Sequence, residues 1–153
     1  MYGDSAAARL HVRLVRSLVP DSVASDEVLS GMREELARFG SLAAGEGYPR
    51  AEVEVLLAED ASEAIAAVGG RPAARATDVS LVARAWIVRA QGDAPESDTG
   101  DVRAEDVIAV DESGGGLDLR ASAFRESDAL RAAGHRLGRA LADKLTRAGA
   151  SPL

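Results

Sequence analysis

The strand signal that runs from Thr77 to Arg89 constrains the fold more than any other feature of the sequence. Small and aliphatic residues occupy one face of this segment, and the other face mixes serine, arginine, valine and tryptophan. A side-chain period of two is typical of a half-buried β-strand. Gly69, Gly70 and Pro72 come shortly before the segment, and these residue types favour a turn. The pattern therefore predicts a sheet built around one long hairpin strand.

Three other segments are predicted strands. Leu10–Arg16 and Ala51–Ala58 show the same alternation, and Val102–Val110 shows it more weakly. Residues 59–68 are ambiguous, because their propensity is helical but a bent continuation of the strand into the hairpin would also fit. Residues 91–101 are rich in Gly, Pro, Ser and Asp, which predicts an exposed, mobile loop.

A first helix is predicted over residues 26–39, where apolar residues recur at helical spacing. Ser25 or Asp26 is expected to cap its first turn, since both side chains can accept a backbone hydrogen bond. Gly40 follows the last apolar position and is expected to end the helix.

A second helix is predicted over residues 127–147, with Ser127 as its cap and Gly149 beyond its end. Its "GHRLG" stretch at 134–138 has small residues at both ends. We expect this spacing to mark close approach of the helix to the sheet rather than a dimer contact.

The predicted order is β-α-β-β-β-α, which makes an α+β two-layer sandwich. Two helices on one face of a mostly antiparallel four-stranded sheet bury the apolar faces most simply. The predicted single domain covers residues 9–148, with flexible termini at 1–8 and 149–153. The predicted common core consists of Leu29, Met32, Leu36, Val53, Leu81, Ile87, Leu137 and Leu141.

Composition excludes several functional classes. The chain has 153 residues, a net charge of −7 and no cysteine. A net anion repels phosphate backbones, so no nucleic-acid partner is predicted. Without cysteine there is no disulfide, thiolate zinc site or cysteine nucleophile. No apolar run approaches the ~20 residues that a membrane span needs, and no signal peptide is visible.

Catalytic groups are sparse, so no catalytic residue, metal site or cofactor is predicted. His11 and His135 are expected at the surface, without the positioned partner that a general base needs. The glycine runs near residues 69 and 114 lack the spacing of phosphate-binding loops and are interpreted as turns. Two pairs of acids that lie close together in the sequence are interpreted as residues of solvated faces: Glu52 with Glu54, and Asp60 with Glu63.

Residues 68–89 are basic within an acidic chain. They carry four arginines and one acid, a local balance of +3. Two interpretations stay open: solvated turn and strand residues, or a binding site for a polyanion, which guanidinium groups hold by forked hydrogen bonds. Trp86 shares a face with Arg84, which favours an amphipathic anion over a nucleotide. The candidate ligand-binding residues are Arg71, Arg75 and Arg84.

Three stretches, in this order, resemble the LPS-assembly lipoprotein family (LptE). "LHVRLVRSLVPDS" with "LSGMREELARFGSL" is similar to that family's first strand and helix. "GGRPAARATDVSLVARAWIV" resembles its central hairpin and long third strand, and "FRESDALRAAGHRLGRALADKL" its closing helix. The likeness covers about residues 9–147. The family's lipidated N-terminal cysteine is absent, and the loop at 91–101 is longer and more acidic than the family pattern.

The resemblance implies a lipid-anchored outer-membrane protein on the periplasmic side. Such a protein plugs the LptD-type barrel and assists the insertion of lipopolysaccharide into the outer leaflet. It also implies that Arg71 and Arg75, which occupy the family's basic hairpin, bind lipopolysaccharide. We further expect the native precursor to be lipidated at a cysteine upstream of Tyr2.

Two other hypotheses rest on the residues alone. One is a small non-catalytic anion- or protein-binding α+β module, dimeric through an edge strand. The other is an enzyme, for which the sequence offers scattered carboxylates and no assembled catalytic group.

Overall fold

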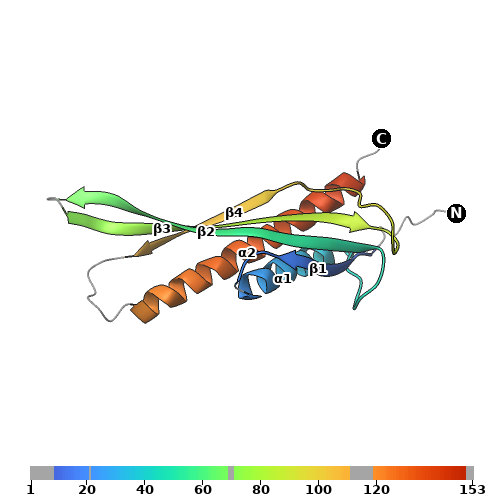
Figure 1. Cartoon of the computed structure of the whole chain (residues 1–153), viewed down its shortest axis with the longest axis horizontal. Helices are drawn as coiled ribbons and strands as arrows, with labels where there is room; N and C mark the ends of the chain where they lie inside the picture. Colours follow the sequence, from blue (N-terminus) through green and yellow to red (C-terminus); the bar gives the residue numbers. More distant parts are fainter. Residues whose placement is uncertain (1–8, 21, 69–70, 111–118, 151–153) are drawn as a thin grey trace.

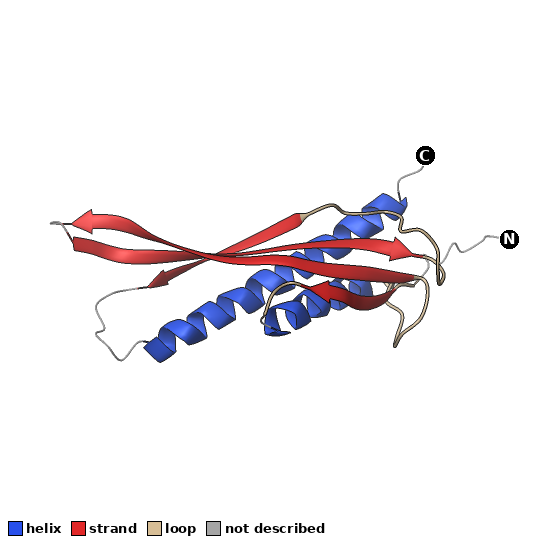
Figure 2. Ribbon diagram, viewed as in Figure 1, coloured by secondary structure: helices blue, strands red, loops and turns tan. Residues whose placement is uncertain are grey.

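The computed structural model describes residues 9–20, 22–68, 71–110 and 119–150. The chain forms an α+β fold in the predicted order, with two helices packed against a four-stranded sheet (Figures 1 and 2). The elements are β1 (His11–Ser17), α1 (Ser22–Arg38), β2 (Arg50–Val68), β3 (Arg71–Val88), β4 (Val102–Val110) and α2 (Leu119–Ala150).

The sheet follows chain order, β1-β2-β3-β4. β1 runs parallel to β2, and the other two pairs are antiparallel, which confirms the mostly antiparallel prediction. The parallel pair follows from connectivity, because α1 carries the chain back across the sheet between β1 and β2. β2, β3 and β4 are instead joined by hairpin connections.

The β2–β3 hairpin is longer than the sequence pattern predicted. The ambiguous residues 59–68 continue β2 as a strand, paired with β3 as far as Val68 opposite Arg71. Pairing with β3 therefore overrides a weak helical propensity, as tertiary context often does. β1 stops early, at Ser17 opposite Val55, so the hairpin projects beyond it (Figure 1).

α1 begins earlier than predicted and ends as predicted. It starts at Ser22, so Ser25 lies inside the helix, buried, with its Oγ 2.8 Å from Ser17 Oγ. The assignment of Ser25 or Asp26 as the cap was wrong. Gly40 has φ +70°, and its N–H donates to Ala37 O at 3.0 Å. This left-handed glycine ends the helix in the expected way.

α2 is longer than predicted at both ends. It begins at Leu119, so Ser127 is an internal residue and not the cap. It continues to Ala150, so Gly149 lies inside the helix rather than beyond it. Polar residues near position 127 gave a start signal that the observed helix does not use.

Glycines let α1 and α2 cross at short distance. A Cβ on Gly31 would overlap the carbonyl oxygen of His135, and one on Gly138 would overlap that of Val28. The "GHRLG" stretch does mark a close approach, but mainly to α1 rather than to the sheet. At Gly134 an added Cβ would lie 3.1 Å from Ala24 O and 3.5 Å from Leu81 Cδ1.

One hydrophobic cluster joins the helices to the sheet. Each of the eight predicted core residues belongs to it, and none is more than 9% exposed. Alanines on β2, β3 and α2 fill the remaining contacts, which suits a core with few aromatic residues. The two-layer prediction is therefore confirmed by the packing as well as by the order of elements.

Candidate functional site

Two of the three predicted ligand-binding arginines lie on the projecting part of the hairpin. Arg71 is the first residue of β3 and pairs with Val68 across the turn. Arg75 pairs with Ala64 on β2 and with Val110 on β4. The structure describes the backbone of Arg71 and Arg75 but not their side chains. The positions of these two residues are therefore given by strand register alone.

Arg84 lies elsewhere on β3 and is paired with an acid of the following loop. Its Nε donates to both carboxylate oxygens of Asp98, at 2.8 and 3.0 Å, and its Nη2 donates to Asp98 Oδ2. The hydrogen bond from Arg84 holds the pKa of Asp98 below its ordinary value near 3.8, although partial burial opposes the shift. The same hydrogen bond raises the pKa of Arg84. This forked ion pair holds a carboxylate of the protein itself.

The structure does not bring the three arginines together. Arg75 and Arg84 are nine positions apart on one strand, which corresponds to about 30 Å at ~3.3 Å per residue. A single bound headgroup cannot span that distance. Arg71 and Arg75 are therefore the pair that could share a ligand, and Arg84 acts locally.

The loop that Arg84 holds is exposed as predicted, but it is fastened to β3. Ile87 and Glu96 exchange two backbone hydrogen bonds of 2.8 Å, and Thr99 N–H donates to Ala85 O at 2.9 Å. Arg89 forms an ion pair with Glu96. The loop thus runs beside β3, attached by backbone hydrogen bonds and ion pairs, and the prediction of a mobile loop is not supported. Two acids of the loop, Asp98 and Glu96, are the partners of Arg84 and Arg89, which a sequence without register could not reveal.

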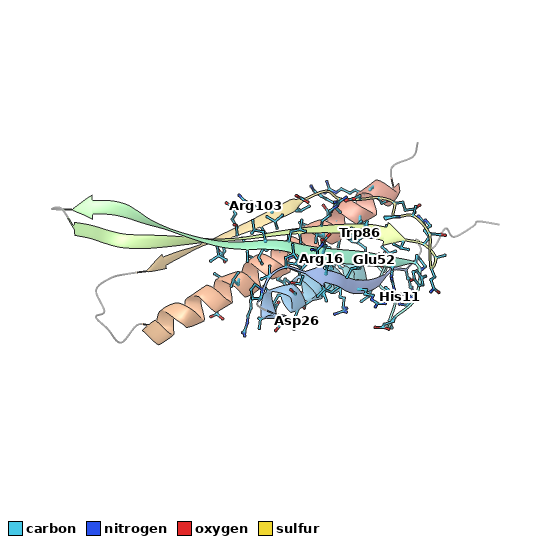
Figure 3. The ribbon with its side chains drawn as sticks, in the orientation of Figure 1. His11, Arg16, Asp26, Glu52, Trp86 and Arg103 are labelled. Atoms are coloured by element: carbon cyan, nitrogen blue, oxygen red, sulfur yellow. The ribbon has the colours of Figure 1, made fainter. Side chains whose placement is uncertain are left out.

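A network around Trp86 was missed by sequence analysis. Trp86 Nε1 donates to Glu52 Oε1 at 3.1 Å, and Glu52 Oε2 lies 2.6 Å from Arg50 Nη2 (Figure 3). The Arg50 guanidinium lies over the Tyr48 ring, 4.4 Å from its centroid, and Arg84 lies 5.9 Å from that of Trp86. Glu52 is 13% exposed, so its interpretation as a solvated residue was wrong.

Register explains why this network forms. Glu52 is directly opposite Trp86 in the β2–β3 pair, on the face away from the helices. Tryptophan N–H groups usually find a partner when partly buried. The sequence placed Trp86 beside Arg84 on one face, but the cross-strand partner of Trp86 depends on a register that alternation alone does not fix.

Both histidines have polar partners in the fold, so the expectation that they lack one was wrong. His11 Nδ1 lies 2.9 Å from the carbonyl oxygen of Gly45. His135 lies between two acids of α1, with Nε2 2.7 Å from Glu34 and Nδ1 3.6 Å from Glu27. Within the described residues, no cluster of His, Asp and Glu could hold a metal ion. None of the described helices combines the length and apolarity needed to cross a membrane.

Comparisons with known proteins show a shared fold. No protein-family model and no curated protein matches the chain. A minor lipoprotein from Acinetobacter baumannii is similar with a TM-score of 0.57 and 12% identity, over 94% of this chain and 96% of that one. Lipoprotein B from Nitrosomonas europaea is similar with a TM-score of 0.55 and 10% identity, over 92% and 86%. The chain therefore has an α+β fold that it shares with these two bacterial lipoproteins.

Proposed function

We propose that this protein is an LptE-like lipoprotein of the outer membrane that assists lipopolysaccharide transport and assembly without catalysis. Its partners would be an LptD-like barrel, which it plugs from the periplasmic side, and lipopolysaccharide, bound through Arg71 and Arg75. A lipid anchor at an N-terminal cysteine would hold it at the membrane. The chain shares its fold with two proteins called lipoproteins, over most of the length of each. This likeness supports the proposal that it is a lipoprotein.

The long β2–β3 hairpin is the observation that carries the proposal. The 19 residues of β2 correspond to about 60 Å at ~3.3 Å per residue. β1 begins opposite Arg50, at the far end of β2 from the turn. An anchor that precedes β1 would therefore hold one end of the molecule, while Arg71 sits at the other. That length exceeds the ~40–45 Å of a bilayer with its headgroups.

The chemistry at the turn suits a phosphorylated lipid. Arg71 and Arg75 are four positions apart on β3, with a register shift between them, so their backbone positions lie at most about 13 Å apart along the strand. Guanidinium groups bind phosphate through two parallel hydrogen bonds. Two arginines at this spacing can contact two phosphates of one lipid headgroup, whereas Arg84 already holds Asp98.

Binding of purified lipopolysaccharide at low and high salt tests the proposal. Arg71→Ala/Arg75→Ala should weaken binding clearly and remove much of its salt dependence. Each single change should weaken it only a few-fold, because an exposed ion pair contributes about 1 kcal/mol or less. Arg33→Ala/Arg131→Ala is the matched control, since it removes two exposed helix arginines. Equal binding by both folded double variants would show that the hairpin arginines bind no lipopolysaccharide.

A further inference from the structure

One edge of β2 has no paired strand over a long stretch, as far as the described part of the chain shows. β1 pairs with β2 as far as Val55, where Leu18 N–H donates to Val55 O at 2.9 Å. β2 continues to Val68, with β3 on its other side throughout. Among the described residues, no strand pairs with the β1-side edge of Leu57–Val68, and we call this segment the free edge.

The free edge is a template for another strand. In a β-strand about half of the backbone N–H and C=O groups point to each side. Those on the unpaired side are available to an incoming segment, and folded proteins normally keep such edges short or covered. The free edge is longer than a typical whole strand of about 5–6 residues. It can therefore supply a complete ladder of hydrogen bonds.

Charge decides which occupant fits. The segment Leu57–Val68 contains Glu59, Asp60 and Glu63 and no basic residue. A second copy of the chain, paired antiparallel on the same edge and centred on residue 61, would place Glu59 of each copy opposite Glu63 of the other. Like charges across a strand pair are destabilising, and opposite charges are favourable. The free edge thus disfavours self-pairing and favours a basic strand.

Exposed apolar residues lie where the free edge begins. Val15, Leu18 and Leu57 are 50%, 53% and 41% exposed. Leu18 bonds to Val55, two positions before Leu57, so the apolar residues stand where β1 ends and the free edge begins. A segment that continued the line of β1 beyond Leu18 would lie beside Leu57.

We propose that the free edge binds an extended, basic segment of a partner protein by β-strand addition. Backbone hydrogen bonds to β2 would supply affinity, and lysine or arginine side chains opposite Glu59 and Glu63, four positions apart in regular register, would supply selectivity. This site uses the β2 backbone and its acids, whereas the proposed lipopolysaccharide site uses arginines of β3. The two proposals can therefore fail separately.

A short fluorescent peptide of alternating lysine and valine is the probe. It should bind the protein and slow amide hydrogen exchange within 57–68. Replacing its central valine by proline should weaken binding about tenfold, since proline removes a ladder hydrogen bond. A glutamate–valine peptide should not bind. Equal binding of the proline peptide, or unchanged exchange in 57–68, would overturn the proposal.

Charge reversal in the protein completes the test. Glu59→Lys/Glu63→Lys should weaken binding of the lysine–valine peptide about tenfold, because the cross-strand charge pairs become repulsive. Glu46→Lys/Asp128→Lys changes the net charge equally at exposed positions elsewhere and should bind like wild type. If both variants lost the same peptide affinity, the effect would come from net charge alone, and this would contradict the proposal. So would self-association of the wild type through this edge.

Discussion

Arg84 and Trp86 lie two positions apart on β3, and each has an acidic partner in the folded chain. Arg84 holds Asp98 of the loop that follows, and Trp86 donates to Glu52 on β2. Both contacts tie distant segments to the same end of the sheet. Arg84 therefore has a structural role, because it holds the loop that leads into β4. The binding hypothesis rests on Arg71 and Arg75.

The Arg84–Asp98 pair should respond to acid. The pKa of Asp98 is lowered in the folded chain, mainly by its hydrogen bond with Arg84. Its contribution to stability is thus complete above the unfolded value near 3.8 and lost as the pH falls through the lower folded value. The NMR signal of Arg84 Nε–H should shift with a midpoint below pH 3.8. Asp98→Asn should lack that transition, and a midpoint at or above the unfolded value would contradict the assignment.

Among the elements, α1 and α2 depend on glycine at their crossing. Gly138→Ala should destabilise the fold by roughly 1–3 kcal/mol, because the added Cβ would overlap Val28 O and lie 2.7 Å from Met32 N. Helix propensity alone would predict the opposite sign, a gain of about 1 kcal/mol. Urea denaturation measures the difference. Gly134→Ala is the matched control and should cost less, since its closest contacts are 3.1 Å; a stabilised Gly138→Ala would refute the tight crossing.

The apolar stripe of α2 should carry much of the stability. Leu137 is fully buried in the cluster that joins the helices to the sheet. Leu137→Ala should therefore cost about 2–5 kcal/mol in the free energy of unfolding. Lys144→Ala on the exposed side of α2 should cost little. An unchanged denaturation midpoint for Leu137→Ala would place the stripe outside the core.

Sequence patterns predicted the elements better than their ends. Alternation found β1, β4 and the inner parts of β2 and β3, since the buried face of each strand keeps a period of two. It could not extend β2 through residues 59–68, where alanines and acids suit a helix as well as a strand. Ser127 looked like a cap although α2 begins at Leu119. At each of these places, strand pairing and packing determined the secondary structure and overrode local propensity.

The candidate site was predictable in part. The excess of arginine near the hairpin was visible from composition, and strand order then placed Arg71 and Arg75 beyond the end of β1. The partners of Arg84 and Trp86 were not predictable, because Asp98 and Glu52 meet them through a loop path and a strand register. These contacts removed Arg84 from the set of residues that could share a ligand.

At the scale of the whole molecule, the two ends carry different tasks in the proposed function. The β1 end would sit near a lipid anchor, and the hairpin turn would reach the lipid headgroup inside the barrel. β2 and β3 run from one end to the other and stay paired along their length, with register shifts between Val55 and Leu57 and on either side of Ala66 (Figure 1). The free edge of β2 lies along the projecting part, where no strand of the described residues pairs with it.

Purification of the full-length protein from detergent-solubilised outer membranes tests the central claim most directly. We predict that mass spectrometry finds it acylated at an N-terminal cysteine and that an LptD-like barrel co-purifies with it in a stable complex. A chain carrying Glu46→Lys/Asp128→Lys should behave identically, which controls for non-specific charge effects. Recovery of the protein in the aqueous fraction, without acyl modification and without a barrel, would contradict the account.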